Sequence, residues 1–324
     1  MKLSSKKMFS ILSKYGIIIA LLAIIVIFSI ATNGLFISRD NVFNIFLSAS
    51  ITIIIAMGVT FSVAVGGFDL SAGSIVSLTA VVVASMFIWY EFSLLTSILV
   101  ALGVVILAGC LNAFIIIKLK IPDMLSTLGT LFIIGGLALS YSSGKIVSKN
   151  MIMANGQTAS GEFTAAFLKL GHEPWIIIIM LFVVIFSYIL LNHTKQGRYI
   201  YVIGGNPEAA ELSGVNIKKY KALAYILSAV CAGIGGILLA SKMGQANPGA
   251  GASYLMEAVA STFIGLSFLN ANKANAIGTF LGTIIIVSLI SGLTMISMPY
   301  YTVNIVKGVV LVLALALSYT KRHN

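Results

Sequence analysis

One run of polar residues lies between two long apolar stretches and has the residue types of a structured element: Asn206, Pro207, Glu208, Glu211 and Gly214. Asparagine is a preferred N-cap residue, and proline suits the first position of a helix. Acidic side chains near a helix start are stabilised by the helix dipole, and glycine can adopt the left-handed conformation that ends a helix. The run predicts a short capped helix with a small surface at Ala209 and Ala210. Such a helix could dock in a groove of a partner protein or lie on a membrane surface.

A second run interrupts an apolar stretch with residues that break or cap helices: Gly66, Gly67, Asp69 and Ser71. Asp69 and Ser71 can cap a helix that follows them. If the flanking stretches cross a membrane, one interpretation is a tight turn between them, with Asp69 as a simple N-cap. The other adds a pathway role, because irregular backbone at membrane depth is tolerated only beside protein or a water-filled cavity and marks translocation pathways in transporters.

Further polar side chains lie inside apolar stretches. The uncharged ones are Asn112, Ser126, Thr127, Thr130 and Ser228. They could bind a neutral, hydroxyl-rich solute weakly, but such residues are equally common where membrane helices pack together. Glu257 and Lys307 are the charged cases, and charge at membrane depth usually has a function. Lys307 could instead extend its amine to the membrane surface, and Glu257 could be solvated near a helix end or bond to backbone freed by a helix break.

The residues that enzymes need are missing, so we expect no catalytic residue, no metal site and no cofactor. There is no GxxxxGK[ST] loop to hold the phosphates of ATP. The histidines His172, His193 and His323 are scattered along the chain. The cysteines Cys110 and Cys231 each lie in an apolar run and form no Cys/His cluster for a metal.

The composition indicates that most of the chain is surrounded by lipid and not by water. Of its 324 residues, 59% are hydrophobic and 9% are charged, whereas a soluble domain has about 25% charged residues. The mean hydropathy is +1.07, so a water-exposed surface cannot be assembled from this composition. We expect an all-α, polytopic membrane helix bundle with membrane lipid around it. The net charge of +11 does not indicate nucleic acid, because no basic segment is interleaved with aromatic residues.

A membrane-spanning helix needs about 20 mostly apolar residues. Candidate spans are 15–31, 45–65, 71–89, 93–117, 125–140, 175–191, 220–240, 255–268, 276–293 and 303–317. The span at 255–268 is short and contains Glu257, so it could be broken or re-entrant. We expect about ten spans, within a range of eight to ten.

The positive charges predict the orientation, since Lys and Arg gather on the cytoplasmic side of membrane proteins. With ten spans and a cytoplasmic N-terminus, 14 of the 20 Lys and Arg residues lie inside and five lie outside. Both termini are then cytoplasmic. We expect one transmembrane domain over 1–324, an inner loop at 192–219 and an outer loop at 141–174.

Four segments resemble the ABC-importer permeases of the ribose, xylose and galactoside type. Glu208, Ala209 and Ala210 followed by Gly214 resemble the EAA-xxx-G signature of such permeases. Residues 66–74 resemble their GGxDLSxGS segment, residues 121–130 their IPxxxxTLGT segment, and residues 197–207 their GRyiyAiGgNp loop. The resemblance covers roughly residues 40–315, with the motifs in the family order.

The resemblance implies the membrane subunit of an ATP-driven importer of a monosaccharide such as ribose, xylose or a galactose-like sugar, in the bacterial cytoplasmic membrane. It implies three partners: a separate ATPase subunit, an extracytoplasmic sugar-binding protein, and a second permease copy or a paralogue. In this family the inner loop inserts into a cleft of the ATPase, which makes these the coupling candidates: Gly204, Asn206, Pro207, Glu208, Ala209, Ala210 and Gly214. The pathway candidates are Gly66, Gly67, Asp69, Ser71, Asn112, Thr127, Thr130 and Glu257. An ion- or proton-coupled secondary transporter of a small polar solute is the alternative.

Overall fold

The computed structural model describes residues 18–153, 156–266 and 273–323, and their regular structure is almost entirely helical. The first described helix is Ile18–Ala31. The elements that follow are η1 (Leu35–Ile37), α2 (Arg39–Ala64), α3 (Ala72–Ile88), α4 (Leu94–Lys118), α5 (Asp123–Tyr141), β1 (Val147–Ser148), α6 (Ala165–Leu170), α7 (Trp175–His193), α8 (Lys195–Gly205), α9 (Pro207–Leu212), α10 (Ile217–Met243), β2 (Gln245–Ala246), α11 (Gly251–Leu266), α12 (Ala276–Met295) and α13 (Tyr300–His323).

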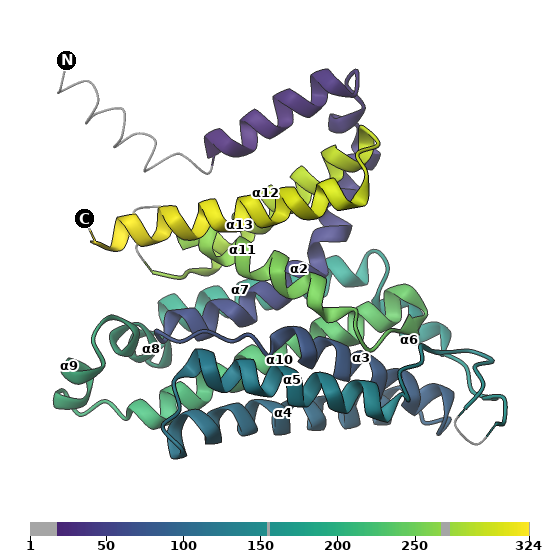
Figure 1. The fold of residues 1–324 in the computed structure, drawn as a ribbon, viewed down its shortest axis with the longest axis horizontal. Helices are drawn as coiled ribbons and strands as arrows, with labels where there is room; N and C mark the ends of the chain where they lie inside the picture. Colours follow the sequence, from purple (N-terminus) through teal and green to yellow (C-terminus); the bar gives the residue numbers. More distant parts are fainter. Residues whose placement is uncertain (1–17, 154–155, 267–272, 324) are drawn as a thin grey trace.

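The long helices form one bundle, with their axes running in roughly the same direction (Figure 1). Six of them are long and apolar enough to cross a membrane: α2, α4, α5, α7, α10 and α12. The apolar windows of α2 and α10 are 67% buried, whereas those of α5 and α7 are 28% buried. On the outer helices Leu107, Phe132 and Phe182 are about 70% exposed, a surface that suits lipid and not water. The predicted all-α membrane bundle is confirmed.

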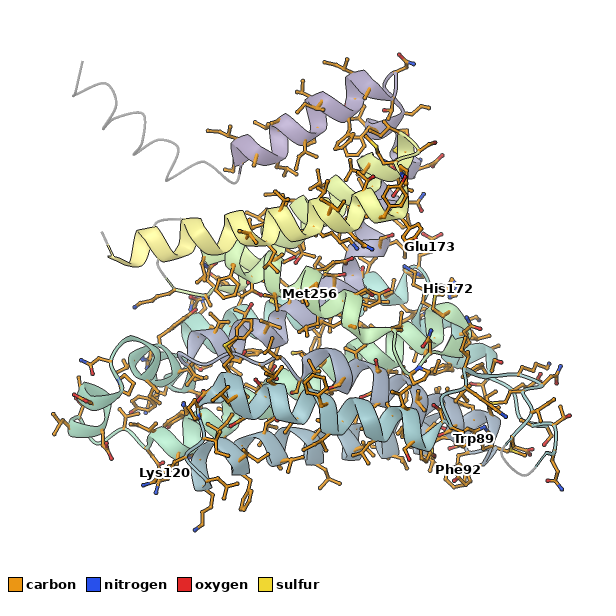
Figure 2. The ribbon with its side chains drawn as sticks, in the orientation of Figure 1. Trp89, Phe92, Lys120, His172, Glu173 and Met256 are labelled. Carbon is orange, nitrogen blue, oxygen red and sulfur yellow. The ribbon has the colours of Figure 1, made fainter. Side chains whose placement is uncertain are left out.

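The bundle has two distinct ends. Lys120 lies at the end where α8 and α9 project, and Trp89, Phe92, His172 and Glu173 lie at the opposite end (Figure 2). We call these the α9 end and the α6 end. The start of helix Ile18–Ala31 and the end of α13 both point toward the α9 end (Figure 1).

Helix starts in this chain are set by short polar side chains next to apolar runs. Their side-chain oxygens accept hydrogen bonds from backbone N–H groups that no helical carbonyl can reach. The capping residues of α2, α4, α8, α10 and α12 are Ser38, Ser93, Thr194, Asn216 and Asn275. Local sequence therefore determines where most of the long helices begin.

Two short strands tie together loops that are far apart in the sequence. β1 and β2 pair antiparallel, with Val147 opposite Ala246 and Ser148 opposite Gln245. β1 belongs to the expected outer loop at 141–174, and β2 follows α10 directly. α6 also lies in this loop, where Thr164 caps it. The pairing fixes the loop to the α6 end of the bundle.

Each of the ten expected segments overlaps one of the described helices, and several helices extend beyond the expected bounds. Residues 15–17 of the first segment and 267–268 of the eighth lie outside the described residues. Of the two alternatives for the eighth segment, a break is wrong over the described part, because α11 runs without interruption from Gly251 to Leu266. A re-entrant segment stays a prediction.

The prediction of a tight turn between the second and third segments is also wrong. Seven residues of irregular backbone, 65–71, separate α2 from α3. α3 has only 17 residues and all of them are buried, whereas the neighbouring α4 has 25. At 1.5 Å per residue α3 is about 26 Å long, shorter than the about 30 Å of a bilayer core. In the irregular segment 65–71 that precedes α3, Val65, Asp69 and Ser71 are buried, whereas Gly66 is exposed.

Candidate functional site

α9 is the short capped helix that the sequence predicts. The side chain of Asn206 accepts a hydrogen bond from the N–H of Ala209 at 3.0 Å, and Pro207 occupies the first turn. Gly214 follows the helix with a φ of 77°, the left-handed conformation that favours glycine. Glu208 is exposed and Ala210 is completely buried. The helix thus has one face anchored to the protein and an acidic face that is free.

α8, which sequence reasoning missed, carries α9. Its buried residues Gly197, Ile200 and Ile203 recur every three residues, and this spacing was the signal for an amphipathic helix. A side chain at Gly197 would collide with the carbonyl of Leu190 on α7. The hydroxyl of Tyr201 donates to the carbonyl of Ala274 at 2.8 Å. Burial raises the pKa of the Tyr201 hydroxyl to about 12. α8 is therefore held against α7 and against the residues before α12.

Two glycines of the segment 65–71 let other parts of the protein approach closely. A Cβ added at Gly66 would lie 3.1 Å from the Cα of Gly204 on α8, and Gly66 has a φ of +83°. A Cβ added at Gly67 would lie 2.2 Å from the hydroxyl oxygen of Tyr225 and 2.3 Å from Oδ2 of Asp123. The contact at Gly66 joins a pathway candidate to the coupling candidate Gly204.

Asp69 lies at the centre of a buried hydrogen-bond network. Its Oδ1 accepts from the N–H of Ser71 at 2.9 Å and from the hydroxyl of Ser71 at 2.6 Å. Its Oδ2 accepts from the hydroxyl of Ser228 on α10 at 2.7 Å. All three residues have no exposed surface. Asp69 precedes the first turn of α3, whose dipole favours a negative charge there. Its hydrogen bonds join irregular backbone to α10, whereas the N-cap position of α3 is Ser71, so the interpretation of Asp69 as a simple N-cap is wrong.

The network continues into α4 and α5. The side-chain amide of Asn112 donates to the hydroxyl of Ser71 at 2.7 Å, and its Oδ1 accepts from the hydroxyl of Thr130 at 2.6 Å. Thr127 donates to the carbonyl of Phe68 at 2.9 Å. These bonds join α4 and α5 to the segment 65–71. We call Asp69, Ser71, Asn112, Thr130 and Ser228 the Asp69 cluster.

A second polar group lies beside Gly67 and was missed from the sequence. The amine of Lys221 lies 2.7 Å from Oδ1 of Asp123, and the hydroxyl of Tyr225 donates to Oδ2 of Asp123 at 2.7 Å. Asp123 begins α5 and the other two residues lie near the start of α10. Lys221 and Tyr225 are one turn apart, the only local signal for this site.

Glu257 and Lys307 form an ion pair inside the bundle. The Lys307 amine lies 2.6 Å from Oε1 of Glu257, and the hydroxyl of Thr52 donates to Oε2 at 3.1 Å. The preceding residue, Met256, lies near the middle of the bundle (Figure 2). Separate explanations for the two charges, a lysine reaching the membrane surface and a glutamate bonded to freed backbone, are therefore wrong. The pair links α11 to α13, and Thr52 adds α2.

The structure places the polar and pathway candidates in three separate regions. Asp69, Ser71, Asn112, Thr127 and Thr130 form one continuous buried region with Ser228, and the exposed Gly66 and half-buried Gly67 lie beside it on the same segment. Glu257 stands apart with Lys307, and Ser126 bonds only within its own segment, to the carbonyl of Ile121. Among the described residues no three His, Cys, Asp or Glu side chains lie close enough to hold a metal ion. These regions supply hydrogen-bonding groups and close backbone contacts. Such groups can bind a polar solute and transmit movement between helices.

Comparisons of the chain with a family model and with curated proteins agree on one family. Residues 41–315 match the family model described as "Branched-chain amino acid transport system / permease component". The chain belongs to this permease family. The relatives resemble it over nearly their full length, so it is a multi-pass membrane permease subunit, and any ATP hydrolysis belongs to a separate subunit.

Three curated relatives illustrate the similarity. Ribose import permease protein RbsC of Escherichia coli (strain K12) is 32% identical over 308 residues, which cover 94% of this chain and 93% of the relative. Galactose/methyl galactoside import permease protein MglC of the same strain is 33% identical over 334 residues, which cover 98% of each. Xylose transport system permease protein XylH of Haemophilus influenzae (strain ATCC 51907 / DSM 11121 / KW20 / Rd) is 28% identical over 356 residues, which cover 94% of this chain and 95% of the relative. No solved structure matches the permease.

Proposed function

We propose that this permease imports a monosaccharide, such as ribose, xylose or a galactose-like sugar, across the bacterial cytoplasmic membrane. The observation that carries the proposal is the match of more than 90% of the chain to permeases named for these sugars. The family model is named for branched-chain amino acids, but the whole-chain relatives are more specific. A separate ATPase supplies the energy, and an extracytoplasmic sugar-binding protein delivers the sugar.

The structure gives no support to the alternative of proton coupling. A proton carrier needs a carboxylate that can exchange its proton during the cycle. Glu257 is paired with Lys307, and Asp69 accepts three hydrogen bonds from Ser71 and Ser228. In this conformation both carboxylates are thus engaged with donors, and the relatives named as sugar import permeases favour the ATP-driven interpretation.

For the topology we propose ten spans with both termini in the cytoplasm. Fourteen of the 20 Lys and Arg residues then lie inside. The α9 end is the cytoplasmic end, and helix Ile18–Ala31 and α13 are oriented accordingly (Figure 1). Residues 1–324 act as one permease domain, with an inner loop at 192–219 that holds α8 and α9 and an outer loop at 141–174. A second copy or a paralogue completes the transport pathway.

In this topology α9 is the element that docks in the ATPase. Its acidic face at Glu208 is exposed, and its Ala210 face is buried against the permease. Asn206, Pro207 and Gly214 keep the helix folded at its two ends, so a partner does not have to order it. Ala209 adds an exposed small side chain beside Glu208, and Gly204 holds the supporting helix α8 against α2.

Movement of α9 reaches the pathway through α8. A shift of α8 acts on Gly66 at its contact with Gly204, and Gly66 begins the segment that carries Asp69. The Asp69 cluster then transfers the shift to α4, α5 and α10, because each contributes a hydrogen-bonding side chain. ATP binding and hydrolysis would in this way change the packing around α3, beside which we place the sugar pathway.

The docking proposal predicts the effect of Glu208→Lys. Placing like charges together across an interface costs several kcal/mol, so ATPase recovery with the purified permease should fall at least about tenfold. ATP-dependent sugar uptake into membrane vesicles should fall with it. The measurements are quantitative co-purification from the native membrane and uptake of labelled sugar.

Asp40→Lys is the matched control, because Asp40 is also exposed in the first turn of a helix, at the start of α2. It should leave ATPase recovery and uptake unchanged. Normal coupling in Glu208→Lys would refute the docking role. Uptake that proceeds without ATP and collapses with an uncoupler would refute the ATP-driven mechanism itself.

A further inference from the structure

A groove lies near the α9 end, between α7, α8 and α10. It encloses about 530 Å³, within the about 300–1,000 Å³ range of ligand sites in proteins. Phe186 and Ile189 of α7 form one wall, and Leu223 and Leu227 of α10 form the other. Phe186 and Ile189 are 43% and 48% exposed, so the groove is open to the surroundings of the bundle. None of these residues belongs to the regions described above.

The groove changes from apolar to polar along the bundle axis. Its inner part is formed by side chains of the two long apolar helices, and its mouth is formed by Thr194, Gln196 and Lys219. Lys219 and Leu227 are eight residues apart on α10, which corresponds to about 12 Å of helix. One leaflet of a bilayer has about 15 Å of hydrocarbon, half of the about 30 Å core. The groove therefore has the length and polarity of one lipid acyl chain below its headgroup.

The mouth of the groove carries only positive charge. α7, α8 and α10 contain no Asp or Glu, and Lys195 and Arg198 of α8 are exposed. The amine of Lys219 lies 5.8 Å from the ring centre of Tyr220, and among the described residues no carboxylate is within ion-pair distance of it. Lys219 is thus a free cation at the headgroup level.

We propose that this groove binds one anionic glycerophospholipid of the cytoplasmic leaflet, with an acyl chain between α7 and α10 and the phosphate at Lys219. The proposal rests on the proposed orientation of the chain and not on the transported sugar. Phospholipids have the required combination of a long apolar chain and a negative headgroup, and basic pockets between membrane helices bind anionic headgroups. A lipid here would brace the α7–α8 contact that supports α9.

The test uses the full-length permease, purified in detergent and stripped of lipid, and native mass spectrometry with added phosphatidylglycerol or phosphatidylcholine. Wild type should bind one phosphatidylglycerol in preference to phosphatidylcholine. Lys219→Ala should weaken phosphatidylglycerol binding roughly fivefold, which corresponds to about 1 kcal/mol for one basic residue. Lys218→Ala is the matched control, because Lys218 is exposed and does not line the groove, and its binding should equal that of wild type.

Two further experiments test the acyl chain and the phosphate of the lipid separately. Leu223→Trp fills the apolar part and should reduce binding of both lipids, and a thermal unfolding curve without lipid checks that this variant is folded. Glycerol 3-phosphate at millimolar concentration should not displace the lipid, because it lacks the acyl chain. Equal binding of the two lipids by wild type, or unchanged phosphatidylglycerol binding by Lys219→Ala, would overturn the proposal. These outcomes are independent of sugar uptake, so they leave the transport function as a separate question.

Discussion

Asp69 and Glu257 are both carboxylates inside an apolar bundle, yet the protein holds them in different ways. Asp69 has no exposed surface, and its bonds come from the N–H and hydroxyl of Ser71 and the hydroxyl of Ser228. The side chain of Glu257 is 14% exposed and pairs with the amine of Lys307. Asp69 binds irregular backbone to the bundle, whereas Glu257 joins two regular helices.

The difference determines how each site responds to movement. An ion pair inside a protein gains attraction but loses hydration, so its net contribution to stability is small and the helices it joins can separate when water enters. The Asp69 cluster has no cation, and its donors must converge from the segment 65–71 and from α10. An unpaired group there would remain buried, which costs more than a lost bond in water. We therefore expect the Asp69 cluster to move as a unit and the ion pair to open and close.

The largest expected effect is that of Asp69→Ala. Three donors, the N–H and hydroxyl of Ser71 and the hydroxyl of Ser228, lose their acceptor in a buried site. At about 1–3 kcal/mol for each of the three unsatisfied groups, the loss of stability is on the order of 3–9 kcal/mol. Thermal unfolding in detergent should show a strongly lowered midpoint, and sugar uptake should be lost.

Asp40→Ala is the control for removal of a carboxylate from an exposed helix start, and its unfolding midpoint should stay near that of wild type. Asp69→Asn should be less harmful than Asp69→Ala, because the amide oxygen can still accept hydrogen bonds. If Asp69→Ala unfolds at the temperature of wild type, the cluster does not hold the segment 65–71, and the comparison with Glu257 fails.

The ion pair should give an intermediate and reversible effect. Glu257→Gln leaves Lys307 as an unpaired charge, which costs about 2.5–3.5 kcal/mol at membrane depth. The double variant Glu257→Gln with Lys307→Met removes both charges and should recover most of that stability, because a buried pair is often replaceable by neutral residues.

A double-mutant cycle by thermal unfolding measures the coupling between the two side chains. Uptake by the double variant is the informative measurement beside it. Stable protein with slow uptake would indicate that opening and closing of the pair belongs to the transport cycle. Additive losses in the cycle would mean that the two charges do not interact, contrary to the 2.6 Å distance between them.

The difference between contacts that are local in the chain and contacts that are distant in it explains what the sequence could predict. α9 was predictable because its determinants are adjacent in the chain: Asn206 caps it, Pro207 starts it and Gly214 ends it. The long helices were predictable because each is one apolar run. The pairing of Glu257 with Lys307 was not, since the two residues are 50 positions apart and either charge has a local explanation.

Longer-range contacts were missed for the same physical reason. Ser228 is 159 positions from Asp69, so its role depends on how α10 packs against the segment 65–71. Asp123, Lys221 and Tyr225 look like ordinary helix-end residues until the fold places them beside Gly67. α8 lies in the polar run 192–219, which was interpreted as an inner loop, although its buried positions have a helical spacing.

The smallest expected effect tests whether the Asp69 cluster extends to α5. Thr130→Val keeps the shape of the side chain and removes the hydroxyl that donates to Oδ1 of Asn112 at 2.6 Å. The buried oxygen loses its donor, which should cost about 1–2 kcal/mol. Ser126→Ala is the control on the same helix, since Ser126 bonds only to the carbonyl of Ile121. If the network transmits movement, Thr130→Val should slow uptake more than Ser126→Ala does, at equal protein levels in the membrane. Equal uptake and equal unfolding midpoints in the two variants would confine the cluster to Asp69, Ser71, Ser228 and Asn112, and α5 would then be joined to the segment 65–71 through Thr127 and not through Thr130.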